Sequence, residues 1–142
     1  MNSNDYYGKT NVKLFFDIET LPADEKNKKA AIDAALAKEL SKNPKCKKNQ
    51  KSLNLLYRQT SLSGDFGNIF CIGYAINDQE INVIKVTEVQ ILTSWWDLAQ
   101  KADIFIGHNI MDFDLRFIYK RSIINNIKPA AKHLNLSFAR YR

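Results

Sequence analysis

The chain has 142 residues, of which 45% are hydrophobic and 25% are charged. These values are typical of one globular domain with a real core, and they exclude a disordered chain. No apolar run is long enough to cross a bilayer, and the polar first ten residues lack the apolar segment of a secretory signal. We therefore expect no membrane partner, and the two cysteines, which have no metal-ligand spacing, favour a reduced, cytoplasmic setting.

The net charge of +6 is concentrated in one segment. Residues 26–58 hold ten Lys or Arg and two acids, a net charge of +8, so the rest of the chain carries −2. A local basic stretch suits a polyanion such as nucleic acid. The alternative is a solvated lysine-rich surface, which is the commoner meaning of a charge run.

The first half of the chain predicts a strand, two helices and a turn. Residues 12–16 ("VKLFF") form a continuous apolar run typical of a buried strand. A helix with one apolar stripe is expected from residue 24 to about 40, and Pro44 stops it. A weaker helix follows at about 49–60, and residues 63–67 ("SGDFG") have the composition of a turn.

The second half of the chain predicts a hairpin followed by an alternation of helix and strand. Residues 68–76 form a buried strand, and residues 81–86 are its hairpin partner. A capping-box pattern at Thr87 opens the next helix. A short buried strand at 103–107 then leads into a helix that runs to about residue 126.

This order of elements predicts an α/β fold with a mixed sheet. Three antiparallel strands come first, and an α/β crossover follows them. We expect residues 1–142 to form a single domain, with the basic helical segment at about 24–60 as an insertion.

Two carboxylates follow the first predicted strand at a spacing of two residues. Asp17 and Glu19 point to the same side because strand side chains alternate. Two hard oxygen donors at the end of a strand suit a divalent cation, and without one their like charges repel. The alternative is a polar exit from strand to loop, since acids at this spacing are common there.

A second acidic pair follows the strand predicted at 103–107. Asp112 suits the start of a helix, where the macrodipole favours acids. If this strand lies beside the first one, Asp114 reaches the same edge of the sheet as Asp17 and Glu19. Three acids from two strands could hold two Mg²⁺ or Mn²⁺ ions about 4 Å apart, an arrangement that promotes phosphoryl displacement.

Both acidic segments resemble motifs of a known superfamily. The segments "FFDIETLP" (15–22) and "FIGHNIMDFDLRFIYKR" (105–121) resemble the first and second motifs of DEDD (DnaQ-like) 3′–5′ exonucleases, which have an RNase H-like fold. The form Asn-x-x-x-Phe-Asp, from Asn109 to Asp114, is most similar to the exonuclease domains of family B DNA polymerases and their stand-alone relatives. The segment "SLSGDFGNIFCIGYAIND" (61–78) also resembles those relatives.

The resemblance implies a metal-dependent 3′–5′ exonuclease that hydrolyses terminal phosphodiesters of nucleic acid, with the 3′ end of single-stranded DNA as the expected partner. By that resemblance, Asp17 would bridge two Mg²⁺ or Mn²⁺ ions. Glu19 would bind the ion that activates the attacking water, and Asp114 would hold the second ion. The resemblance also makes DNA repair one expected role.

Four further residues match substrate positions of the superfamily. Thr20 and Leu21 match positions that touch the terminal nucleotide. Asn109 and Phe113 match positions that shape the substrate cleft and seat the second motif. For His108 a structural role in the loop is the expectation, since a lone histidine is more often structural.

The third motif of the superfamily, Tyr-x-x-x-Asp or His-x-x-x-x-Asp, has no match, because residues 115–142 contain no Asp or Glu. We expect the chain to be the N-terminal part of a longer nuclease, incomplete at the C-terminus. The alternative is a shortened homologue without the third motif. In either case the 142-residue chain is expected to be weakly active or inactive by itself.

A second class of function stays open at this point. The chain could be a non-catalytic RNase H-like module that binds nucleic acid or a replication partner, with the basic segment as its working surface. The sequence leaves open DNA against RNA, proofreading against repair or degradation, and the oligomeric state.

Overall fold

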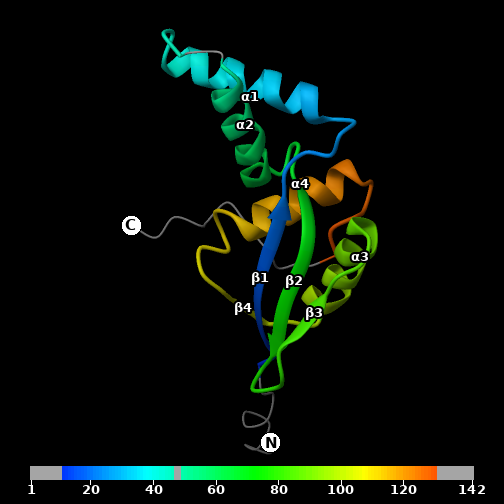
Figure 1. The fold of residues 1–142 in the computed structure, drawn as a ribbon. Helices are drawn as coiled ribbons and strands as arrows, with labels where there is room; N and C mark the ends of the chain where they lie inside the picture. The colour runs from blue at the N-terminus through cyan, green and yellow to red at the C-terminus, as the bar shows by residue number, and fades with distance from the viewer. Residues whose placement is uncertain (1–10, 47–48, 131–142) are drawn as a thin grey trace, which may run out of the picture.

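The computed structural model describes residues 11–46 and 49–130. Its centre is a four-stranded sheet in the order β3-β2-β1-β4 (Figure 1). The strands are β1 (Lys13–Leu21), β2 (Asn68–Ile76), β3 (Asn82–Ile84) and β4 (Ile104–Ile106). Strand β2 runs antiparallel to both β1 and β3, whereas β4 runs parallel to β1. The mixed sheet expected from the order of elements is therefore confirmed.

The helices occupy two separate places around the sheet. Helices α3 (Glu88–Ala99) and α4 (Asp114–Ile124) pack on one face, as Figure 1 shows. Helices α1 (Lys28–Lys42) and α2 (Gln50–Gln59), with the 3₁₀ turn η1 (Thr60–Leu62), lie beyond the end of β1. Within the described part of the chain, no helix is both long and apolar enough to cross a membrane.

The hydrophobic core lies between the sheet and helices α3 and α4. Leu14, Phe16 and Ile18 alternate along β1 and point into this core. The Phe16 ring lies 4.3 Å from the Trp95 ring of α3, centroid to centroid, and Trp95 is fully buried. The residues between them in β1 point to the opposite face, where Phe15 remains 37% exposed. This alternation fixes which face of the sheet carries the acidic residues.

Strand β1 continues past the apolar run at 12–16. It runs to Leu21, because β2 pairs with it as far as Leu21 opposite Asn68. A register shift falls between Glu19 and Thr20. Asp17 and Glu19 therefore lie inside a strand and not in the loop that follows it.

The capping box predicted at Thr87 is confirmed. The Thr87 side chain accepts from the Gln90 backbone N–H, and the Gln90 side chain accepts from the Thr87 backbone N–H. Helix α1 starts later than expected, because Asp24 closes a turn by accepting from the Asn27 backbone N–H at 2.8 Å. Asn49 caps α2 by accepting from the Ser52 backbone N–H at 2.9 Å.

A buried ion pair joins the two core helices to β2. The Arg121 guanidinium of α4 donates to both carboxylate oxygens of Glu88 in α3, at 2.9 and 2.7 Å. The same guanidinium donates to the Asn68 side chain, and Glu88 also accepts from the Ile69 backbone N–H. The side chains of Arg121 and Glu88 are only 9% and 15% exposed.

The ion pair predicts a large loss of stability in one variant. We expect Arg121→Ala to lower the free energy of unfolding by about 3–5 kcal/mol, because it leaves the Glu88 carboxylate buried without its cation. Arg116→Ala is the matched control, since its side chain is 52% exposed and lies 3.8 Å from Asp112; its loss should stay below about 1 kcal/mol. Urea denaturation measures both, and equal losses would contradict the assignment.

Candidate active site

The candidate site begins where β4 ends beside β1. Strand β4 pairs with β1 only through Lys13–Phe15, so β1 continues alone along this edge. At Ile18 the place of a neighbouring strand is taken by a side chain of α4. The Asp114 Oδ1 atom accepts a hydrogen bond from the Ile18 backbone N–H at 3.1 Å. One carboxylate therefore both satisfies the strand edge and fixes the start of α4 against it.

The turn between β4 and α4 places Asp114 at this edge. A Cβ on Gly107 would lie 2.6 Å from the Phe16 carbonyl oxygen, so only glycine lets the chain pass this close to β1. Asn109 then adopts a positive φ of 51°, which asparagine tolerates better than most residues. Its carbonyl accepts from the backbone N–H groups of Asp112 and Phe113 and closes the turn.

Asp114 is a buried carboxylate with an unfavourable charge. The residue is only 2% exposed. Burial raises its pKa above the ordinary 3.8, and repulsion from the nearby Asp17 raises it further. The Ile18 N–H, the Asp114 N–H and the charge of His108 act in the opposite direction without cancelling the effect. A nearby cation would stabilise the charged form of such a carboxylate.

Asp17 lies near enough to Asp114 for its charge to raise the Asp114 pKa, and Glu19 lies on the same face of β1 as Asp17. Across residues 11–46 and 49–130, however, no three His, Cys, Asp or Glu side chains gather closely enough to hold one metal ion. The described carboxylates therefore match a divalent-cation site only in part. Hard carboxylate oxygens suit Mg²⁺, which commonly takes one or two protein carboxylates together with substrate phosphate and water.

Asp17 lies on a face of the sheet that the described helices leave open. A shallow hollow of about 310 Å³ lies beside it, lined chiefly by apolar side chains of three strands. These include Phe15, Ala75 and Ile106, with Ile81 at the rim. A planar apolar group could therefore contact the sheet directly beside Asp17.

The other predicted site residues are placed as follows. The Thr20 hydroxyl donates to the Ser61 carbonyl of η1 at 2.8 Å, so it ties β1 to the next segment. Leu21 is 46% exposed at the end of β1. Phe113 is half-buried with its ring 5.7 Å from that of Phe117, and the Asn109 side chain is exposed. Their contacts with substrate stay predictions.

Sequence reasoning missed two parts of this arrangement. Gly107 is the close-approach residue, and its place as the last residue of a predicted strand was an available signal. Gly67 is the other, since a Cβ there would lie 2.8 Å from the Thr60 carbonyl oxygen and 3.1 Å from that of Leu21. Two basic residues of α4 are engaged within the protein: Arg121 forms the buried ion pair with Glu88, and Lys120 pairs with Asp65 at 2.9 Å.

Comparison with solved structures defines the class of fold. The structure matches that of the family B DNA polymerase from the hyperthermophilic archaeon Pyrobaculum calidifontis with a TM-score of 0.53. Sequence identity is 12%, and the match covers 89% of this chain and 13% of that chain. This likeness shows the fold, which is RNase H-like as the sequence predicted.

Comparison with known families then identifies the chain. The family described as "DNA polymerase family B, exonuclease domain" matches residues 4–139. The chain therefore belongs to this family of DEDD-type exonuclease domains. An uncharacterized protein of Methanocaldococcus jannaschii is 36% identical over 62 residues, which are 42% of this chain and 35% of that relative. The matched region is thus about a third of that relative's length.

The raised pKa of Asp114 predicts a pH-dependent gain from removing its charge. The folded protein binds the carboxyl proton of Asp114 more tightly than the unfolded chain does. The charged Asp114 carboxylate therefore destabilises the fold at neutral pH. Asp114→Asn keeps an oxygen for the Ile18 N–H, so we expect a higher free energy of unfolding at pH 7 in EDTA. The gain should fade as the pH falls through the raised folded pKa towards 3.8.

Urea denaturation of wild type and Asp114→Asn between pH 7 and pH 4 measures this gain. Asp112→Asn is the matched control, because its side chain is 62% exposed and its neutralisation should change little. A clear loss of stability in Asp114→Asn at pH 7 would mean that the fold favours the charged carboxylate, contrary to this account.

Proposed function

We propose that this domain is a metal-dependent 3′–5′ exonuclease acting on the 3′ end of single-stranded DNA. The observation that supports the proposal best is the buried Asp114 carboxylate, which is bonded to the Ile18 N–H and whose pKa the charge of Asp17 raises, in a chain of an exonuclease-domain family. Water attacks the phosphorus of the terminal phosphodiester, and the bond from that phosphorus to the 3′ oxygen of the preceding nucleotide breaks. The hydroxyl stays on the released nucleoside 5′-monophosphate, and the 3′ oxygen of the shortened strand takes up the proton.

Divalent cations, Mg²⁺ or Mn²⁺, would be held by Asp17, Glu19 and Asp114 and would supply charge for the developing oxyanions. The chain's own residues position the reacting end. Asp114 is fixed by its bond to the Ile18 N–H, so its second oxygen has a defined direction. Leu21 and the hollow beside Phe15 offer apolar surface to a terminal base.

The 142-residue chain offers three carboxylates to this site and none after Asp114, since residues 115–142 contain no Asp or Glu. We therefore expect slow cleavage by this chain alone, and faster cleavage by any longer product of the same reading frame that supplies a fourth acid. DNA is proposed as substrate from the family; the same site chemistry acts on RNA phosphodiesters.

The proposal predicts that Asp17→Ala abolishes cleavage. We expect a loss of at least about 100-fold in the rate of release of nucleotides from a 3′-labelled oligonucleotide with Mn²⁺, because several kcal/mol of transition-state stabilisation depends on the bound cations. Asp78→Ala, in the exposed turn between β2 and β3, removes one acid far from the site and should retain the wild-type rate.

The assay applies to the 142-residue chain and to the product of the complete reading frame. Full cleavage by Asp17→Ala would exclude the mechanism. Unchanged affinity for oligonucleotides in every variant, with no cleavage and no effect of Mn²⁺ in the wild type, would favour the non-catalytic binding module instead.

A further inference from the structure

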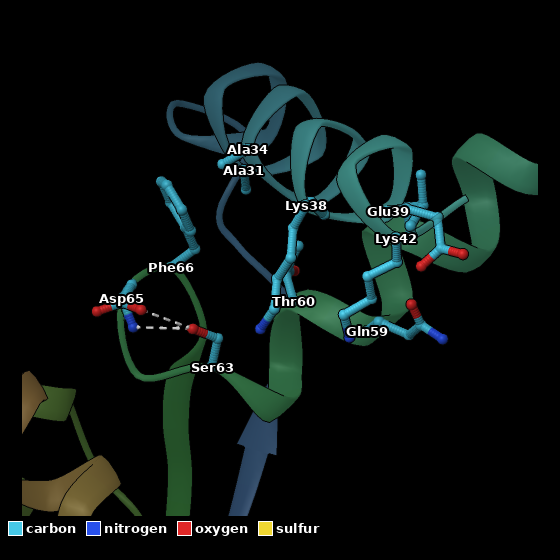
Figure 2. A pocket seen from close by; sticks show the side chains of 12 residues that line it. Ala31, Ala34, Lys38, Glu39, Lys42, Gln59, Thr60, Ser63, Asp65 and Phe66 are labelled. Carbon is cyan, nitrogen blue, oxygen red and sulfur yellow. Dashed lines mark hydrogen bonds between the residues drawn. The ribbon is translucent and has the colours of Figure 1, made fainter. Parts of the chain in front are cut away.

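The helical segment after β1 forms a cleft that the proposed reaction does not use. The cleft lies between α1 on one side and η1 with the 63–66 turn on the other, and it has a volume of about 410 Å³. This is within the range of sites that hold small molecules or single nucleotides. Figure 2 shows Lys38 and Lys42 reaching from α1 towards Gln59 and Thr60 on the opposite wall.

Hydrogen bonds anchor one wall of the cleft to the end of the strand that carries the acids. Thr20 follows Glu19 directly, and its hydroxyl donates at 2.8 Å to the carbonyl of Ser61, the residue after Thr60 of the cleft lining. The Ala23 backbone N–H donates to the Thr60 side chain at 3.0 Å, which fixes the same wall from the other side. The helices and the 3₁₀ turn that form the cleft lie beyond the end of β1 (Figure 1), which is the direction that a bound strand takes in the proposal below.

The lining offers cations for phosphate. Lys38 and Lys42 lie one helical turn apart on one face of α1. Both are exposed, and neither belongs to a salt bridge among the described residues. The acid opposite them, Asp65, is engaged by Lys120, whose ammonium donates to both of its oxygens at 2.9 and 3.0 Å. Glu39 also lines the cleft.

The lining also offers an aromatic ring. Phe66 is half-buried at the turn that closes the cleft, and Figure 2 shows its ring at the end opposite Lys42. A ring beside a row of cations is the combination that binds single-stranded nucleic acid without sequence preference. The surrounding segment, residues 26–58, carries the net charge of +8 that attracts such a strand.

We propose that this cleft binds the single strand of nucleic acid behind its 3′-terminal nucleotide, with Lys38 and Lys42 on phosphates and Phe66 stacked on a base. The inference rests on the proposed function for the place of the 3′ end. It assigns the insertion to holding the strand while the sheet holds the end to be cut.

The test measures binding without cleavage. Fluorescence anisotropy with a 5′-labelled (dT)₁₂ in EDTA compares the wild type with the double variant K38E/K42E. We expect affinity to fall at least about 10-fold, and the slope of log K against log salt to decrease in magnitude by about 1.4, the value for two phosphate contacts on a single strand. Phe66→Leu should weaken binding by about 5-fold or more through lost stacking.

Matched controls separate the cleft from the general charge. K26E/K45E makes the same change in net charge within the basic segment but outside the cleft lining, and it should weaken binding less than about 3-fold. Phe70→Leu removes an aromatic ring that is 39% exposed on β2 and should have little effect. Equal weakening by both lysine pairs, at unchanged melting temperature, would overturn the proposal.

Two further arms separate this proposal from the proposed function. With (dT)₂, which is too short to leave the sheet, K38E/K42E should change affinity no more than the control pair does; a full loss there would overturn the placement. Because EDTA removes the cations, these results stand whether or not Asp17→Ala abolishes cleavage. A parallel (rU)₁₂ series reports the sugar that the cleft accepts, and absence of the cleft-specific loss on both polymers refutes it.

Discussion

The hydrogen bond from the Ile18 backbone N–H to Asp114 is the constraint on which the rest of the site depends. Strand β1 extends beyond the end of β4 along one edge of the sheet. Without Asp114, the Ile18 N–H would be left unsatisfied there. Asp114 satisfies it and becomes buried in doing so, which raises its pKa and sets its charge against that of Asp17. The same contact therefore satisfies the sheet edge and orients α4. It also leaves a buried negative charge that a cation would stabilise.

The two faces of the sheet differ in what they carry. One face is buried under α3 and α4, and a buried ion pair between Arg121 and Glu88 joins these helices to each other and to β2. The other face carries Asp17 and Glu19 and is left open by the described helices. The hydrophobic core and the two carboxylates of β1 thus lie on opposite sides of the strand, whereas Asp114 comes from the buried side. The alternation of side chains along β1 makes this separation possible.

Much of this arrangement could be predicted from the sequence, because it follows from local rules. The two-residue spacing of Asp17 and Glu19 places both on one face, and the capping box marks the start of α3. The full length of β1 could not be predicted, since pairing with β2 carries the strand past the apolar run at 12–16, through the two acids and on to Leu21. The burial of Arg121 also could not, because its partner Glu88 is 33 residues away and only the fold brings them together.

The central claim is that Asp17 and Asp114 form one cation site, and paramagnetic broadening by Mn²⁺ tests it most directly. In ¹H–¹⁵N spectra of the 142-residue chain titrated with substoichiometric Mn²⁺, the account predicts that amide signals of residues 17–19 and 113–115 disappear first, and that Asp114→Asn suppresses this loss. Broadening centred instead on the exposed acids of the helical insertion, such as Glu25 and Asp33, would contradict the account.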